Sequence, residues 1–252
     1  MKKNRFACPV CLLLVIFFIT SCGGAQLRKE QSKASRELGK EYLRGKNYTY
    51  ALRELLEAEK LYSDDHILHN YLGLAYRHKG KPDLAIEHYK KSLKLKHDYA
   101  PARNNLGTAY FDKKDWDSAI ACYKEVAENL LYATPHYPLY NLGRAFYEKK
   151  EYSLSEKYYL AALEQEPEYA VALQGLGRTY IAMGRITEAV TALESAVKKI
   201  PEFAIAYFDL GKVYRLSRKY KKAYGAYNKA IKLAPGTPLA VEAKKELRKL
   251  KR

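Results

Sequence analysis

The sequence predicts an all-α protein, a right-handed α-solenoid of six helix pairs that ends in a capping helix. Three observations lead to this fold class: a glycine that recurs about every 34 residues, small and apolar residues at fixed positions around it, and prolines where second helices should stop. Two short amphipathic helices cannot bury their shared apolar face alone, so each pair must stack on the next pair.

The recurring glycine defines the repeat. Successive glycines lie 34, 34, 36, 34 and 34 residues apart, at Gly39, Gly73, Gly107, Gly143, Gly177 and Gly211. Each follows a leucine and precedes an aromatic residue by three positions, and Ala or Ser comes twelve residues later. These spacings place the leucine, the glycine and the aromatic residue on one face of the first helix. The glycine lets the second helix approach closely because it has no Cβ. Second helices are predicted to stop at Pro167, Pro201 and Pro235.

This pattern resembles the tetratricopeptide repeat, for example in NNLGTAYFDKKDWDSAIACY and LYNLGRAFYEKKEYSLSEKYY. The repeats implied are residues 32–65, 66–99, 100–135, 136–169, 170–203 and 204–237. On this interpretation most of the 24 tyrosines are packing residues. Thr237 and Pro238 are typical of a helix start and predict a capping helix over residues 238–252. The alternative for this helix is a basic membrane-surface helix.

The N-terminus has the features of a lipoprotein signal peptide over residues 1–21. Basic residues precede an apolar run at 6–19, which is too short to span a membrane because crossing takes about 20 residues. The sequence ITSC at 19–22 resembles a bacterial lipobox, which implies diacylglycerol and a further acyl chain such as palmitate on Cys22. In bacterial lipoproteins an aspartate directly after the lipidated cysteine implies retention in the inner membrane. This chain has Gly23 at that position, which implies transport to the outer membrane. The alternative is an ordinary signal peptide that happens to contain a cysteine.

Residues 22–31 are expected to form a lipidated polar tether, in which the coil from Gly23 to Gln31 would span roughly 17 Å and keep the repeats near the membrane. Cys122 would then be the one remaining thiol, so no intramolecular disulfide is expected, and its apolar neighbours predict a core side chain.

The chain is strongly basic, with 45 Lys and Arg against 28 Asp and Glu and a net charge of +17. Removal of the signal peptide leaves 42 basic residues and a net charge of +14. An exported chain with this charge meets anionic lipid headgroups, acidic partner segments and the cell wall. We therefore expect no nucleic-acid partner.

Motifs for catalysis or cofactor binding are not found. The sequence has no glycine-rich phosphate loop, no cysteine pair with zinc spacing and no nucleophile beside a recognisable base. His66 and His69 stand three residues apart, but no further ligand is predictably beside them, so no metal site is expected. Asp64 and Asp65 are interpreted as helix caps and solvated loop. The chain is predicted to be a binding module, not an enzyme, with no cofactor and no small-molecule substrate.

The first helix of each pair should line the concave side of the solenoid, where side chains that point away from the core would face a peptide. These candidate groove residues are Ile67, Asn70, Leu74, Arg77, Asn104, Phe111, Tyr140, Arg144, Tyr147, Arg178, Phe208 and Lys212. Amides can hold a peptide backbone, aromatics supply contact area and arginines favour acidic partners. The alternative is that some of these residues pack against neighbouring repeats instead of facing a peptide. No lysine and asparagine set for clamping a C-terminal carboxylate is found, which disfavours a chaperone adaptor.

The interval of 36 residues places an enlarged junction within ENLLYATPHYP, residues 128–138. The lipobox, six repeats, the length of 252 residues and this junction together resemble the type IV pilus biogenesis lipoproteins, the pilotins of PilF, PilW and Tgl type. That resemblance implies a lipid-anchored protein on the periplasmic face of the outer membrane, which helps secretin subunits assemble. The rival interpretation is a lipoprotein scaffold for cell-wall or outer-membrane assembly enzymes.

Overall fold

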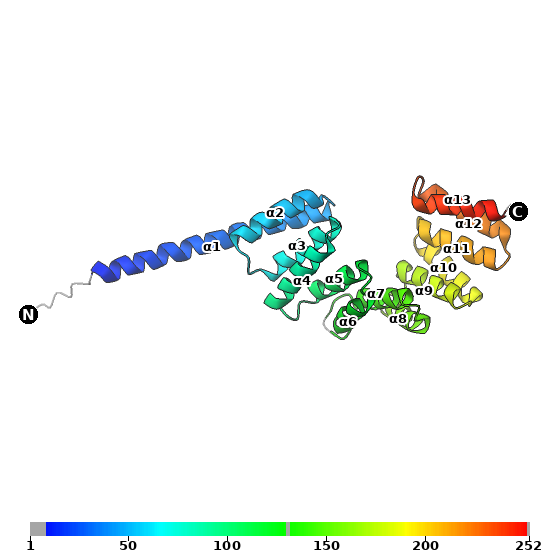
Figure 1. Cartoon of the computed structure of the whole chain (residues 1–252), viewed down its shortest axis with the longest axis horizontal. Coiled ribbons are helices and arrows are strands. Elements are labelled where there is room, and N and C mark those ends of the chain that lie inside the picture. The colour runs from blue at the N-terminus through cyan, green and yellow to red at the C-terminus, as the bar shows by residue number, and fades with distance from the viewer. Residues whose placement is uncertain (1–8, 130–131, 251–252) are drawn as a thin grey trace, which may run out of the picture. The chain divides into compact units, whose positions relative to one another are not determined.

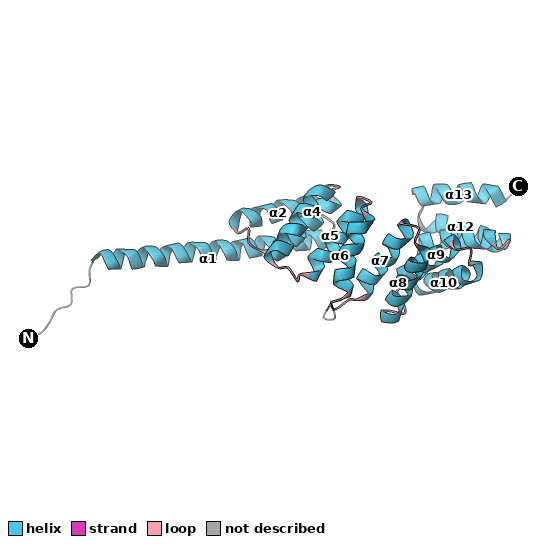
Figure 2. Cartoon of the chain, turned by 60° about the horizontal axis from the view of Figure 1, so that its bottom comes forward, coloured by secondary structure: helices cyan, strands magenta, loops and turns pink. Residues whose placement is uncertain are grey.

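The computed structural model describes residues 9–129 and 132–250, and the side chains from Gly24 onward. Within these residues the chain forms thirteen α-helices and no strand, so the predicted all-α class is confirmed (Figures 1 and 2). The helices are α1 Pro9–Arg44, α2 Tyr48–Leu61, α3 His66–His78, α4 Pro82–Leu95, α5 Ala100–Asp112, α6 Trp116–Ala127, α7 His136–Glu148, α8 Tyr152–Gln165, α9 Ala170–Ala182, α10 Ile186–Lys199, α11 Ala204–Leu216, α12 Tyr220–Leu233 and α13 Pro238–Leu250.

The chain divides into two compact units. The N-terminal unit, Met1–Lys113, contains α1 to α5, and the C-terminal unit, Lys114–Arg252, contains α6 to α13. In the N-terminal unit α1 packs against α2, α3 packs against α4, and α3 also contacts α5. Leu55, Leu68 and Leu72 are fully buried there.

The repeat glycine brings the two helices of a pair together, as its spacing predicts. A Cβ added to Gly73 in α3 would lie 2.5 Å from Cε1 of Tyr89 in α4, closer than carbon atoms can pack. Tyr89 is fully buried, so this tyrosine is a packing residue. The same contact recurs in the C-terminal unit, where a Cβ on Gly211 would lie 2.6 Å from the ring of Tyr227.

Helix α1 differs from the expectation of a flexible tether. It continues through residues 22–31 to Arg44 without a break. Good helix formers fill residues 25–31, Gln26 donates to Glu30 across one turn (3.0 Å), and the Ser32 hydroxyl donates to the Ala58 carbonyl of α2 (2.7 Å). The predicted cleavage point and the Cys22 side chain lie outside the residues whose side chains are described. Among the described residues, no helix combines the length and apolar character that crossing a bilayer requires.

In the C-terminal unit three helix pairs, α7 with α8, α9 with α10 and α11 with α12, stack in chain order and are followed by α13. Their core includes Tyr159, Leu176, Leu210 and Val213. Helix α13 packs against α12 and α11. The Thr237 hydroxyl accepts a hydrogen bond from the Ala240 amide (3.3 Å), which confirms the predicted start of the capping helix.

The connections between helices also follow the sequence. Four residues join each second helix to the next first helix, except that eight join α6 to α7, where the enlarged junction was expected. Residues 130 and 131 of this junction are outside the described part. Pro167, Pro201 and Pro235 each lie two residues after a second helix ends. Cys122 is buried in α6, as predicted.

Candidate protein-binding surface

Three cations occupy the same repeat position on the first helices of the C-terminal unit. Arg144 in α7, Arg178 in α9 and Lys212 in α11 each follow the repeat glycine directly and lie 34 residues apart. Because α7 contacts α9 and α9 contacts α11, these positions form one row across neighbouring helices, called here the cation row. All three side chains are half-buried.

Aromatic rings accompany the cation row. Arg144 lies over the ring of Tyr140 on its own helix, 5.6 Å from the centroid, and Lys212 lies over Phe208 at 4.3 Å. These pairs are four residues apart, the spacing that makes helix positions neighbours. Arg178 instead crosses to α7 and lies 4.6 Å from the centroid of Tyr147. Each cation of the row therefore contacts an aromatic ring, and such contacts contribute about 0.5–2 kcal/mol each.

A buried polar pair holds α9 against α11 beneath this surface. The Gln174 amide donates to Oδ2 of Asp209 at 2.5 Å, and Nζ of Lys212 lies 3.8 Å from Oδ1 of the same carboxylate. Burial raises the pKa of the Asp209 carboxyl, while the hydrogen bond from Gln174 and the charges of Lys212 and Arg178 oppose this shift. Among the described residues, Arg178 forms no ion pair, and its charge acts on Asp209 from a longer distance.

A tyrosine cluster continues the surface at the start of α7. The ring of Tyr140 lies 5.3 Å from Tyr169, which precedes α9, and 5.9 Å from Tyr159 in α8. Tyr137 reaches the same Tyr169 ring at 5.8 Å, edge to face. Burial raises the pKa of Tyr140, Tyr159 and Tyr169, which keeps these phenols neutral. Tyr159 is buried in the core, whereas Tyr140 and Tyr169 are half-buried and leave part of their rings exposed.

In the N-terminal unit, the predicted groove residues on α3 and α5 are mostly amide and apolar side chains with a single arginine. The Asn105 amide donates to the Asn70 side-chain oxygen at 3.0 Å, and Arg77 is paired with Asp112 at 3.1 Å. Leu74 is half-buried, as are Asn104 and Phe111 of α5. The arginine here already has a carboxylate partner, in contrast to Arg178. Ile67, in the first turn of α3, lines a pocket with Arg36 and Asp65. Asp65 also caps α3 by accepting from the Ile67 and Leu68 amides.

Two of the predicted groove residues are buried in the structure, and the expectation that they face a partner is wrong. Asn70 is 4% exposed and Phe208 is 6% exposed. Asn70 is turned inward by its hydrogen bond with Asn105, and Phe208 packs with its ring centroid 5.8 Å from that of Tyr227. The other ten are half-buried. Their role in binding stays a prediction.

The sequence interpretation missed Tyr169 and Asp209. Tyr169 precedes its first helix at the position that Tyr99 and Phe203 hold in two other repeats, and this recurrence of aromatic residues could have identified it. Asp209 gave no such signal, because its partner Gln174 stands 35 residues earlier, on another helix.

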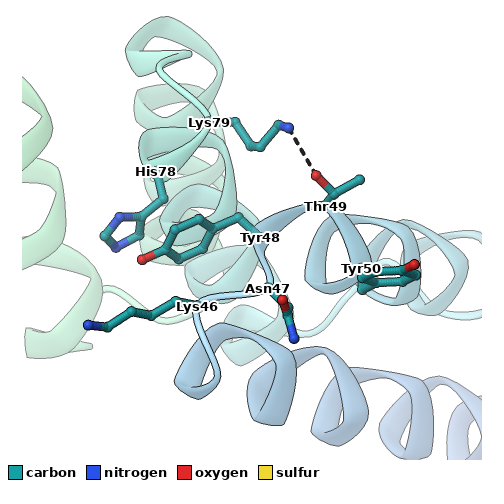
Figure 3. Close-up of a pocket in the computed structure, with 7 residues that line it drawn as sticks. All are labelled: Lys46, Asn47, Tyr48, Thr49, Tyr50, His78 and Lys79. Carbon is teal, nitrogen blue, oxygen red and sulfur yellow. Dashed lines mark hydrogen bonds between the residues drawn. The ribbon is translucent and has the colours of Figure 1, made fainter.

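Figure 3 shows a further pocket of the N-terminal unit, between the α1–α2 turn and the end of α3. Tyr48 stacks on His78 with 4.4 Å between ring centroids, and Lys79 donates to the Thr49 hydroxyl (3.0 Å). Lys46 and Tyr50 point away from each other, so the side chains drawn do not converge on a common point.

The geometry agrees with comparisons to known structures. PilF from Pseudomonas aeruginosa superposes with a TM-score of 0.74 at 20% identity, over 87% of this chain and 99% of the PilF chain. PilW, described as a widely conserved type IV pilus biogenesis factor, gives 0.77 at 20% identity, over 84% of this chain and 98% of its own. MamA gives 0.55 at 28% identity, over 71% and 97%.

Sequence comparison identifies the repeat itself. No curated protein sequence matches the chain significantly. Models of the tetratricopeptide repeat match residues 64–131, residues 104–170 and 175–238, and residues 158–191. One of these models alone covers more than half of the chain. The predicted tetratricopeptide solenoid is therefore confirmed, and the chain belongs to the tetratricopeptide repeat family.

Proposed function

We propose that this protein is a lipid-anchored, non-enzymatic assembly factor, a pilotin, for a type IV pilus secretin on the periplasmic face of the outer membrane. One observation carries the proposal: the fold spans 99% of the PilF chain and 98% of the PilW chain. The structural similarity therefore covers all the repeats of PilF and PilW and is not limited to a few of them. The lipobox-like sequence before Cys22 supplies the expected anchor.

The cation row and its aromatic neighbours are proposed to bind the secretin. Half-buried Arg144, Arg178 and Lys212, together with the half-buried rings of Tyr140 and Tyr147, suit an acidic segment that also offers apolar area. Lipid on Cys22 would confine this surface near the membrane and raise its effective concentration for a secretin subunit at the same membrane. Such binding changes the rate and place of assembly and needs no covalent step.

Replacement of Cys22 by Ser in the native chain tests the anchor and the partner together. We expect the wild-type protein to copurify secretin from outer membranes, and we expect Cys22→Ser to leave the secretin unassembled or in the wrong membrane. The proposed function predicts that outer-membrane secretin multimers depend on this chain. Recovery of cell-wall or outer-membrane assembly enzymes, with secretin multimers unchanged in both strains, would instead favour the scaffold interpretation.

A further inference from the structure

Three side chains that lie far apart in the sequence meet inside the N-terminal unit. Glu59 of α2, His69 of α3 and His88 of α4 each place one ligand atom within 4.8 Å of the other two. Nδ1 of His69 lies 3.1 Å from Nδ1 of His88 and 3.7 Å from Oε1 of Glu59. The helices that carry them are packed together, α2 on α3 and α3 on α4 (Figure 1).

These distances fit a single small metal ion. Zinc is bound at about 2.0 Å by imidazole nitrogen and carboxylate oxygen, and two ligand atoms on a tetrahedral zinc ion are therefore about 3.3 Å apart. The distances of 3.1 Å and 3.7 Å lie on either side of this value. Two imidazoles and one carboxylate are also a ligand set suited to zinc and similar divalent transition metals.

The tautomer of His69 is fixed in the form that binds a metal. Its Nε2 lies 2.7 Å from the carbonyl oxygen of Ser63. A carbonyl oxygen can only accept, so Nε2 carries the proton, and in the neutral ring the lone pair is on Nδ1, which faces His88 and Glu59. Metal-binding histidines commonly donate their other ring nitrogen to a backbone carbonyl in this way.

The surroundings hold the imidazoles in place while leaving an approach. His69 is completely buried, and the ring of His88 is stacked between His69 and Tyr76, with centroids 5.3 Å and 5.2 Å away. His88 and Glu59 are half-buried, so an ion could reach the cluster from their side. The rings would need little movement to bind, but Nδ1 of His88 donates to Nδ1 of His69 in the metal-free chain and must give up this proton to solvent before it can bind a metal.

One cation already competes for this position. Nζ of Lys91 lies 3.2 Å from Oε1 of Glu59, the oxygen that faces His69. A bound metal ion would have to displace this ammonium. The Lys91 side chain is 43% exposed and flexible, so it can turn into solvent.

We propose that Glu59, His69 and His88 form a binding site for a divalent transition-metal ion of the zinc type, with a fourth position left for water or a partner's ligand. The ion would join α2, α3 and α4, which belong to two successive helix pairs. Metal binding would therefore stabilise the N-terminal unit. The sequence pointed to His66 as the neighbour of His69, but the His66 ring packs against Tyr99 instead (4.7 Å), and the partners come from other helices.

The test uses the full chain in detergent, without a histidine tag and with Cys8, Cys11 and Cys22 replaced by Ser, so that these thiolates cannot bind metal. Titration with Co²⁺ should produce the visible absorption bands of a tetrahedral site, and Zn²⁺ should abolish them at one equivalent per chain. Glu59→Gln and His88→Ala should each weaken Zn²⁺ binding at least tenfold. His97→Ala, which removes an exposed histidine outside the cluster, should change nothing.

Lys91→Met gives the sharpest readout, because removal of the competing ammonium should tighten Zn²⁺ binding several-fold. A purely structural role for the histidine pair predicts no such gain. Absence of the cobalt bands would overturn the proposal, and so would one-to-one Zn²⁺ binding that is unchanged in Glu59→Gln and Lys91→Met. These two side chains are partly exposed, so their variants keep the test decisive even where His88→Ala fails to fold.

Discussion

The guanidinium of Arg178 in α9 lies 4.6 Å from the ring centroid of Tyr147 in α7, and this contact links two successive first helices of the C-terminal unit. The other two cations of the row, Arg144 and Lys212, lie over aromatic rings of their own helices. Burial opposes the charge of Arg178, but nearby Tyr147 and Asp209 raise its pKa further above the usual value, so the side chain stays cationic. A half-buried, permanent charge without an ion pair among the described residues is a good anchor for an acidic partner.

Arg178→Ala should therefore weaken binding of the secretin's periplasmic region by about fivefold or more, since interface anchors of this kind contribute more than about 1 kcal/mol. Arg178→Lys should retain part of the affinity because the charge remains. The affinity of the wild-type chain should also fall with added salt. Surface plasmon resonance at two salt concentrations measures both effects.

Lys157→Ala is the matched control, because it removes an exposed cation over the Tyr158 ring (5.8 Å) on the second helix α8. It should bind like the wild type. Equal losses in Lys157→Ala and Arg178→Ala would show that overall charge, and not the cation row, determines the affinity.

Gly211→Ala should destabilise the C-terminal unit. The added methyl group would lie 2.6 Å from the ring of the fully buried Tyr227, and overpacking of this kind costs about 1–3 kcal/mol. Gly225→Ala in the neighbouring α12 meets nothing within 4 Å and should stabilise the unit by about 0.5–1 kcal/mol. Urea unfolding of the two variants measures the difference, and a Gly211→Ala protein as stable as Gly225→Ala would refute the close approach of α11 and α12.

Asp209→Asn should leave the C-terminal unit as stable as the wild type, or more stable, at pH 7. Burial raises the pKa of this carboxyl, so the folded state disfavours its charge, and the asparagine oxygen can still accept from Gln174. Gln174→Leu should instead cost about 1–3 kcal/mol because it leaves the buried carboxylate without its donor. Thermal unfolding of both variants measures these opposite effects, and similar destabilisation by the two substitutions would contradict this explanation.

The N-terminal unit should lose stability in mild acid. Burial lowers the pKa of His69 and of His88 below the usual 6.5, while Glu59 opposes and Lys91 reinforces the shift. Below pH 6.5 the unfolded chain takes up protons that the folded unit does not, so the stability present above this pH is lost progressively as the pH falls.

Hydrogen exchange of peptides from α3 and α4, measured in a metal chelator at pH 7.5, 6.0 and 5.0 and corrected for intrinsic exchange rates, should show this loss. The double variant His69→Gln and His88→Gln should have a flatter pH profile. The idea fails if the protection of these helices in the wild type is unchanged down to pH 5.0.

The sequence predicted those features that depend on local spacing. The glycine period located the helix pairs, Pro235 and Thr237 bounded the last connection, and Asp65 was identified as a cap. Helix α1 was not predicted in full, since the polar stretch after the signal peptide, which begins with two glycines, was interpreted as coil, although residues 25–31 are good helix formers.

Contacts between helices were harder to predict, because they depend on side-chain directions that the period does not encode. Phe208 shares the repeat position of Tyr140, yet it turns into the core. The sequence suggested His66 as the histidine beside His69, whereas the histidine that contacts His69 is His88, 19 residues away on another helix. A repeat pattern fixes which helix face a residue occupies, but packing decides whether the side chain is exposed.

The central claim is that this chain assembles a secretin, and the most direct measurement is the amount of secretin multimer in outer membranes of a strain that lacks the chain. We expect multimers to be lost there, and to be restored by the wild-type chain and by Lys157→Ala but not by the triple variant Arg144→Ala, Arg178→Ala and Lys212→Ala. Normal multimers in the strain without the chain would contradict the account.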